Sequence, residues 1–159
     1  MTDLSAETAE YAGFWVRLWA SLVDTVIYLL LTTPLLLAIY GWDYFDLAED
    51  TYGFIAGPAD ALISFVIPFA ITLWMWMKYK ATPGKMLFSL KIVKTDIGEA
   101  LTLKESVIRY FSYFAAAIPL CIGFIWIAFD PKKQGWHDKI AGTVVVRSRL
   151  RGTEPVRFP

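Results

Sequence analysis

Three long apolar runs dominate the chain, and polar segments separate them. A helix needs about 20 apolar residues to cross roughly 30 Å of hydrocarbon, and each run reaches or nearly reaches that length. The pattern predicts an all-α membrane protein, built as a small transmembrane helical bundle in a single domain. The expected helices cover residues 14–40, 61–79 and 106–129, and the expected polar segments are 41–60, 80–105 and the tail 130–159.

The composition favours a membrane protein over a soluble one. Hydrophobic residues make up 57% and aromatic residues 16% of only 159 residues, which is high for a soluble domain of this size. A buried helix pair in a large soluble protein is the alternative, but the chain has no room for such a core. Residues 1–12 contain no lysine or arginine. We therefore expect no cleaved signal peptide, and a first helix that stays in the mature protein.

The charges of the connecting segments predict an orientation. The segment 41–60 is acidic and lacks basic residues, whereas 80–105 is rich in lysine. Basic segments stay on the cytoplasmic side of the membrane. The sequence therefore predicts an extracytoplasmic segment 41–60, a cytoplasmic segment 80–105 and a cytoplasmic N-terminus.

The third apolar run conflicts with this orientation if it crosses the membrane once. A single crossing would put the basic tail outside, where the charge rule does not favour it. Pro119 and Gly123 interrupt the run, and both residue types break helices. A re-entrant pair of half-helices would return the tail to the cytoplasmic side. A kinked single span with an external tail is the alternative.

Two short β-branched stretches predict a small β element on the cytoplasmic side. Ile92 and Val93 precede an Asp-Ile-Gly turn, and residues 142–147 read GTVVVR. These strands can pair only if both lie on the same side of the membrane, which again favours a returning third run. Thr102 and Glu105 form a capping-box pattern that opens the third helix. Between the second run and the first strand, we expect an amphipathic segment whose lysines 80, 85 and 91 reach lipid headgroups.

The first run carries two charges, Arg17 and Asp24. Seven residues place them on nearly the same face but about 10.5 Å apart along the axis, so each needs a partner elsewhere. Arg17 lies near the cytoplasmic interface, where Asp130 or Asp138 of a returning tail could pair with it. Asp24 lies deep in the membrane, where a carboxylate costs roughly 2.5 to 3.5 kcal/mol. Its candidate hydrogen-bonding neighbours are Ser21, Tyr28, Ser64, Thr72 and Arg109.

These features together resemble the RDD family of prokaryotic membrane proteins. The resemblance rests on Arg17, on Asp24, on TPGKMLFSLKIVKTDIG at 82–98 and on DPKKQGWHDKIAGTVVV at 130–146. It implies that Arg17 and Asp24 are the arginine and the first aspartate of the family name, and that Asp138, or otherwise Asp130, is the second. It also implies a location in the prokaryotic inner membrane. Transport of ions or small ligands is proposed for the family, and cation/proton antiport is attributed to some members.

Three classes of function follow for comparison. In the first, the protein is a homo-oligomeric carrier of monovalent cations and protons that uses Asp24, whose charge can depend on occupancy in a low dielectric. In the second, it is a non-transporting module whose basic face binds a partner protein or anionic lipid. An enzyme is the third, and no nucleophile–base pair supports it. Asp24 could equally be a structural clamp between helices.

No motif in the sequence indicates a cofactor, a metal or a nucleic-acid partner. His137 has no second ligand at a metal-binding spacing, so we expect a structural or gating histidine. Cys121 is the only cysteine, so the chain cannot form an internal disulfide. The arginines of the tail more often meet anionic lipid than nucleic acid when they lie beside a membrane.

Overall fold

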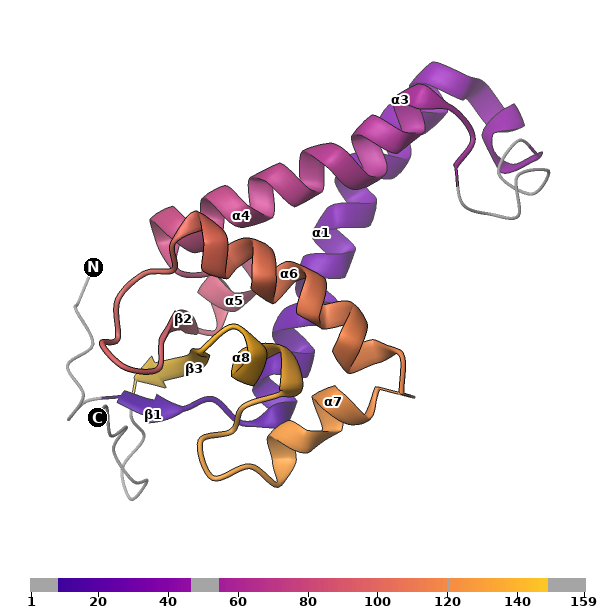
Figure 1. Cartoon of the computed structure of the whole chain (residues 1–159). Coiled ribbons are helices and arrows are strands. Elements are labelled where there is room, and N and C mark those ends of the chain that lie inside the picture. The colour runs from indigo at the N-terminus through magenta and orange to yellow at the C-terminus, as the bar shows by residue number, and fades with distance from the viewer. Residues whose placement is uncertain (1–8, 47–54, 120, 149–159) are drawn as a thin grey trace.

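The computed structural model describes residues 9–46, 55–119 and 121–148. Parts of the predicted acidic segment and of the basic tail lie outside these residues. The described chain is mostly helical, with one small sheet of three strands. Two helical stretches, Phe14–Asp46 and Pro58–Leu87, are long and apolar enough to cross a membrane. A third, bent stretch follows. The predicted class, a small apolar helical bundle with a minor β element, is confirmed (Figure 1).

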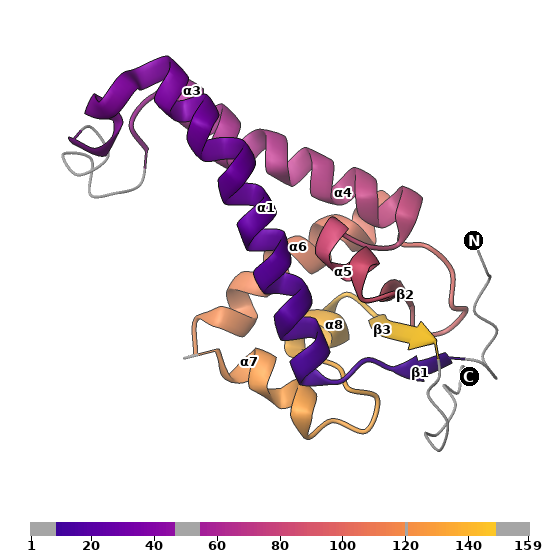
Figure 2. The same cartoon turned by 180° about the vertical axis from the view of Figure 1, so that it is seen from behind.

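The two long helical stretches form an open V (Figures 1 and 2). Helix α1 (Phe14–Tyr40) leads into the short turn η2 (Gly41–Asp43). The second stretch consists of α3 (Pro58–Ala61), the π-helical turn η3 (Leu62–Val66) and α4 (Ile67–Tyr79). Pro68 has no N–H to donate, and the wider π turn just before it accommodates the missing bond. Exposed leucines cover α1, as expected where a helix faces lipid.

Three strands form an antiparallel sheet at the open end of the V. The strands are β1 (Ala9–Tyr11), β2 (Lys91–Lys94) and β3 (Thr143–Ser148), in the order β1-β3-β2. Ile92 pairs with Val145, and both are fully buried. The predicted pairing of β2 with β3 is confirmed. Strand β1, which pairs Glu10 with Arg147, was not among the predicted strands.

The third apolar segment is broken, as predicted. Helix α6 (Leu103–Ala117) starts at a complete Thr102–Glu105 capping box. Its axis meets that of α7 (Ile122–Ile125) and the following turn η4 (Trp126–Ala128) at 110°. Gly123 permits this fold-back, because a Cβ there would lie 2.6 Å from the Ala116 Cα atom. Strand β2 precedes the segment and its partner β3 follows it, so the chain returns to the end of the bundle that it left.

Helix α5 (Pro83–Leu87) packs against α1, and this corrects the expectation for the predicted interfacial segment. Met86, Leu87 and Phe88 are exposed, but Lys85 is only 7% exposed and points into the bundle. Lys85 therefore does not reach outward as predicted. The physical reason is that its ammonium group lies beside two oxygen partners at the α1–α5 contact, the Thr82 hydroxyl and the Asp24 carboxylate.

The contact between α5 and α1 makes Gly84 sensitive to substitution. In Gly84→Ala, the new Cβ would lie 2.2 Å from the Ala20 carbonyl oxygen, which is backbone and cannot rotate away. We expect the free energy of unfolding, measured by denaturation in detergent micelles, to fall by about 1–3 kcal/mol through overpacking.

Gly13→Ala is the matched control for this substitution. A Cβ added at Gly13 would meet no neighbouring atom within 4 Å. The helix N-cap preference for glycine over alanine leaves a smaller loss there, below about 1 kcal/mol. Equal losses in the two variants would contradict a close α1–α5 contact.

Candidate functional site

Arg17 lies in the first turn of α1 and is buried at the end of the bundle that carries the sheet. Its Nε donates to the Ala12 carbonyl at 2.9 Å and its Nη2 to the Lys133 carbonyl at 2.6 Å. Its Nη1 donates to Asp138 Oδ2 at 2.5 Å. The guanidinium therefore connects the start of α1 with the tail. Of the two aspartates that the sequence left open, the structure pairs Asp138 with Arg17.

Asp138 forms ion pairs with two buried arginines at once. It belongs to α8 (Trp136–Ile140), and its side chain has no solvent exposure. Arg109 Nη1 lies 2.5 Å from its Oδ1, and the Gly135 amide donates to Oδ2 at 2.9 Å. Burial alone would raise the pKa of Asp138, but Arg109 and Arg17 together lower it well below its usual range. The carboxylate is therefore ionised at neutral pH.

Arg109 extends this cluster to the sheet and to the aromatic core. It donates to the hydroxyl of Thr143 at the start of β3. Its guanidinium lies over the rings of Trp76, at 5.5 Å, and Tyr113, at 5.8 Å. The prediction that Arg109 is a neighbour of Asp24 is therefore wrong. Arg109 is held in the cluster instead, because Asp138 offers a buried carboxylate there.

His137 is packed among aromatic rings beside the cluster. Its ring stacks on Tyr113 at 4.4 Å and lies 5.1 Å from Phe124. Burial lowers the pKa of His137 most, and nearby Arg109 and Arg17 lower it further, to about 3, despite the opposing effect of Asp138. The imidazole is therefore neutral at physiological pH. Among the described residues, no group of three His, Cys, Asp or Glu side chains could hold a metal ion.

Asp130 has a separate, local role. It pairs with Lys139 and accepts from the backbone amides of Lys132 and Gln134, at 3.1 Å each. Burial raises its pKa, but Lys139 and these amides outweigh that effect and lower it. Asp130 therefore holds the turn before α8. The alternative that pairs it with Arg17 is wrong.

Asp24 lies at the junction of α1 and α5, away from the arginine cluster. Its Oδ2 accepts from the Thr82 hydroxyl at 2.5 Å, and its Oδ1 accepts from the Gly84 amide at 2.6 Å. Lys85 Nζ lies 3.9 Å away. As predicted, Asp24 does not pair with Arg17.

The predicted hydrogen-bonding neighbours of Asp24 are wrong. The Tyr28 hydroxyl donates to the Ser64 carbonyl, and the Ser64 hydroxyl donates to Asp60. Ser21 accepts from Thr25 through its carbonyl, and Thr72 lines a cavity between α1 and α4. The actual partners lie in the sequence Thr82-Pro83-Gly84-Lys85. Threonine followed by proline is a helix-start signal, and exposed amides at a helix start attract carboxylates. That signal could have identified them.

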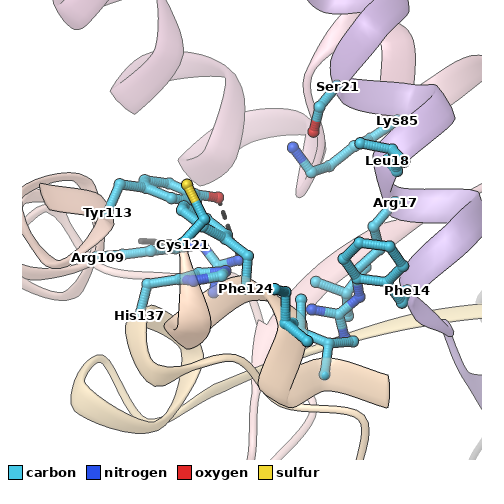
Figure 3. Close-up of a pocket in the computed structure, with 13 residues that line it drawn as sticks. Phe14, Arg17, Leu18, Ser21, Lys85, Arg109, Tyr113, Cys121, Phe124 and His137 are labelled. Atoms are coloured by element: carbon cyan, nitrogen blue, oxygen red, sulfur yellow. Dashed lines mark hydrogen bonds between the residues drawn. The ribbon is translucent and has the colours of Figure 1, made fainter. Parts of the chain in front are cut away.

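Two cavities flank the Asp24–Lys85 pair. The first, of about 420 Å³, lies at the sheet end of the bundle among α1, α5, α6 and α7 (Figure 3). Its polar lining includes Arg17, Lys85, Arg109 and His137. The second, of about 560 Å³, lies between α1 and α4 and is lined by Asp24 and Thr82. The two members of one ion pair thus line two different cavities.

Comparison with known proteins identifies a family and several similar sequences. The sequence profile described as the RDD family matches residues 11–142. The membrane protein YteJ of Bacillus subtilis, described as uncharacterized, is 35% identical, over 90% of this chain and 85% of its own length. YxaI of the same organism is 30% identical, over 85% and 96% respectively. A Rickettsia prowazekii protein, RP437, is 39% identical over 54% of this chain and 46% of its own length. No solved structure matches the chain.

The first prediction for this site concerns Asp138. In Asp138→Asn, Arg17 and Arg109 would remain buried without their shared counter-charge, and breaking such a pair costs about 3–5 kcal/mol. We expect that loss in the free energy of unfolding in detergent micelles. The control is Asp96→Asn, because Asp96 is exposed and accepts a surface bond from the Ile97 amide in its own turn. The control should change stability by less than about 0.5 kcal/mol. A similar, small change in both variants would contradict the central role of Asp138.

The second prediction concerns the pH dependence of stability. The folded pKa of His137, about 3, lies below its ordinary value of 6.5, so the unfolded chain binds the proton more tightly. The contribution of His137 to the free energy of unfolding is therefore fully present above pH 6.5. It falls by about 1.4 kcal/mol per pH unit as the pH drops toward 3. His137→Phe keeps the stacked ring but cannot titrate. Unfolding measured between pH 4 and 7 should show a shallower slope in this variant, and an unchanged slope would contradict a buried, neutral histidine.

Proposed function

The chain belongs to the RDD family of integral membrane proteins, and we propose that it is a small carrier that exchanges monovalent cations for protons at Asp24. One observation carries the proposal: Asp24 and Lys85 face each other from two separate cavities. A ligand that enters either cavity and binds the partner there can open such an ion pair.

The Asp24–Lys85 pair is suited to exchange because it is loose. Lys85 Nζ and Asp24 Oδ2 are 3.9 Å apart, and the Asp24 side chain is 23% exposed. Coulomb attraction weakens with distance, so this contact is weaker than the 2.5 Å contacts of Asp138. A competing ion therefore has less attraction to overcome at Asp24 than at Asp138. The Asp138 pairs, with 2.5 Å contacts and no exposure, are the opposite case.

The chemistry around Asp24 supports a cation as the competing ion. The Asp24 carboxylate and the Thr82 hydroxyl present oxygen atoms at the second cavity, and hard cations bind oxygen ligands. A proton or a metal ion on Asp24 would remove the counter-charge of Lys85. Lys85 would then turn toward the first cavity, which it already lines. Binding at one cavity would thus be transmitted to the other.

The arginine cluster would serve as the fixed support of this carrier. Arg17, Asp138 and Arg109 join the start of α1 to α6 and α8. We place the sheet and this cluster on the cytoplasmic side, because the lysines of 80–105 precede and follow β2. We also propose a homo-oligomer, since so few helices enclose little space for a pathway.

The alternative function is a non-transporting module that binds a partner protein or an anionic membrane surface. One observation favours it: Met86, Leu87 and Phe88 are exposed together at the end of α5, close in sequence to basic residues 80 and 91. Apolar side chains flanked by lysines bind membrane surfaces. In that case Asp24 would only clamp α5 against α1.

A flux assay separates the two functions. Purified protein in liposomes that contain a pH-sensitive dye is challenged with pulses of Na⁺, Li⁺ or K⁺. The carrier should change the internal pH, and Asp24→Asn should abolish that response because the exchanging charge is gone. Asp43→Asn is the matched control, because Asp43 is exposed in η2, at the other end of α1. Its response should equal that of the wild type.

Two results would count against the carrier. A wild-type protein without any flux would rule it out and leave the module. Flux that survives in Asp24→Asn would show that exchange takes place elsewhere in the protein.

A further inference from the structure

The first cavity has an unusual charge for a space inside an apolar bundle. Three cationic side chains, Arg17, Lys85 and Arg109, line it, and no acidic side chain of the described residues does. Asp138 offsets only one of the two arginine charges, from behind the cavity wall. Asp24 lies farther from Lys85, at 3.9 Å, than Asp138 lies from the arginines. The cavity therefore presents a net positive charge to anything that enters it.

Lys85 and Arg109 keep hydrogen-bonding capacity in this cavity. Lys85 is 7% exposed, and its ammonium group makes long contacts, 3.4 Å to the Thr82 hydroxyl and 3.9 Å to Asp24. Arg109 Nε is buried and has no hydrogen-bond partner among the described residues. Figure 3 shows Lys85 extending from α5 toward Tyr113 and Arg109, with the Ser21 hydroxyl beside it. Donors from α1, α5 and α6 thus surround one space.

Most of the remaining lining is apolar, and it reaches the protein surface. Leu18 on α1 and Ile125 on α7 are 38% and 47% exposed, and both line the cavity. Phe14, Phe124 and Ile127 complete the apolar wall. In an integral membrane protein, an opening between apolar helices faces the acyl chains of lipid. A ligand for this cavity must therefore combine an anionic head with an apolar body.

We propose that this cavity binds the anionic headgroup of a phospholipid, with the phosphate at Lys85. Phosphate oxygens accept charge-assisted bonds from ammonium and guanidinium groups, and the volume of about 420 Å³ is that of an ordinary ligand site. The glycerol and acyl chains leave between Leu18 and Ile125. A choline headgroup does not fit, because it would place a further positive charge beside three cations. The inference goes beyond cation exchange and requires no transport.

Cys121 provides a direct probe of occupancy, because it lines the cavity, is exposed and is the only cysteine of the chain. The rate at which a maleimide labels it is measured in detergent micelles, with increasing phosphatidylglycerol. A lipid concentration of ten times the dissociation constant should slow labelling about tenfold. Phosphatidylcholine and inorganic phosphate should not slow it. Equal protection by phosphatidylcholine, or protection by inorganic phosphate alone, would overturn the proposal.

Substitutions test the role of Lys85. Lys85→Met removes the charge but keeps the side-chain length, and it should abolish protection, whereas Lys85→Arg should retain it. Lys104→Met is the matched control, because Lys104 is exposed on α6 and does not line the cavity. Circular dichroism checks that each variant is folded. Protection that persists in Lys85→Met would overturn the assignment of the phosphate to Lys85.

A variant expected to bind phosphatidylglycerol more tightly provides an independent test. Asp24 competes with the phosphate for Lys85, so Asp24→Asn should tighten phosphatidylglycerol binding, by up to about fivefold. Weaker binding in this variant would contradict the competition. Because every readout is binding, a protein without flux can still pass these tests, and a functioning exchanger can fail them.

Discussion

Asp138 holds a single carboxylate between two buried guanidinium groups, at 2.5 Å from each. A buried charge without a partner costs several kcal/mol, so neither Arg17 nor Arg109 can lie where it does unless Asp138 lies between them. Arg17 comes from α1, Arg109 from α6 and Asp138 from α8. This one contact therefore fixes the relative positions of the beginning, the middle and the end of the chain.

The sheet follows from the same contact. Asp138 is close in sequence to Thr143, where β3 begins, and the Thr143 hydroxyl accepts from Arg109. Strand β3 is therefore held next to α6 and between β1 and β2. Because β2 precedes α6 and β3 follows α7, the third apolar segment must fold back. The break near Pro119 and the close approach at Gly123 make that return possible.

The two charged residues of α1 thus occupy contrasting environments. Each of the three side-chain nitrogen atoms of Arg17 donates a hydrogen bond of 2.9 Å or less. Asp24 is held by the short helix α5 and faces its lysine across 3.9 Å. Opening the Asp138 pairs would leave fully buried charges without partners. Asp24 is 23% exposed and also accepts hydrogen bonds from Thr82 and the Gly84 amide, so its contact with Lys85 is easier to open. A rigid cluster beside a loose ion pair is the arrangement from which both proposals start.

The sequence alone determined the elements that depend on local pattern. The long apolar helices, the break in the third run, the Thr102 capping box and the β2–β3 pair all follow from composition and spacing over a few residues. It also narrowed the partner of Arg17 to Asp130 or Asp138. Tertiary structure decided the rest: the choice of Asp138, the pairing of Asp138 with Arg109, the inward direction of Lys85 and the partners of Asp24. These depend on which helix faces meet, and hydrophobic periodicity does not encode that, because lipid-facing and protein-facing surfaces of such helices are equally apolar.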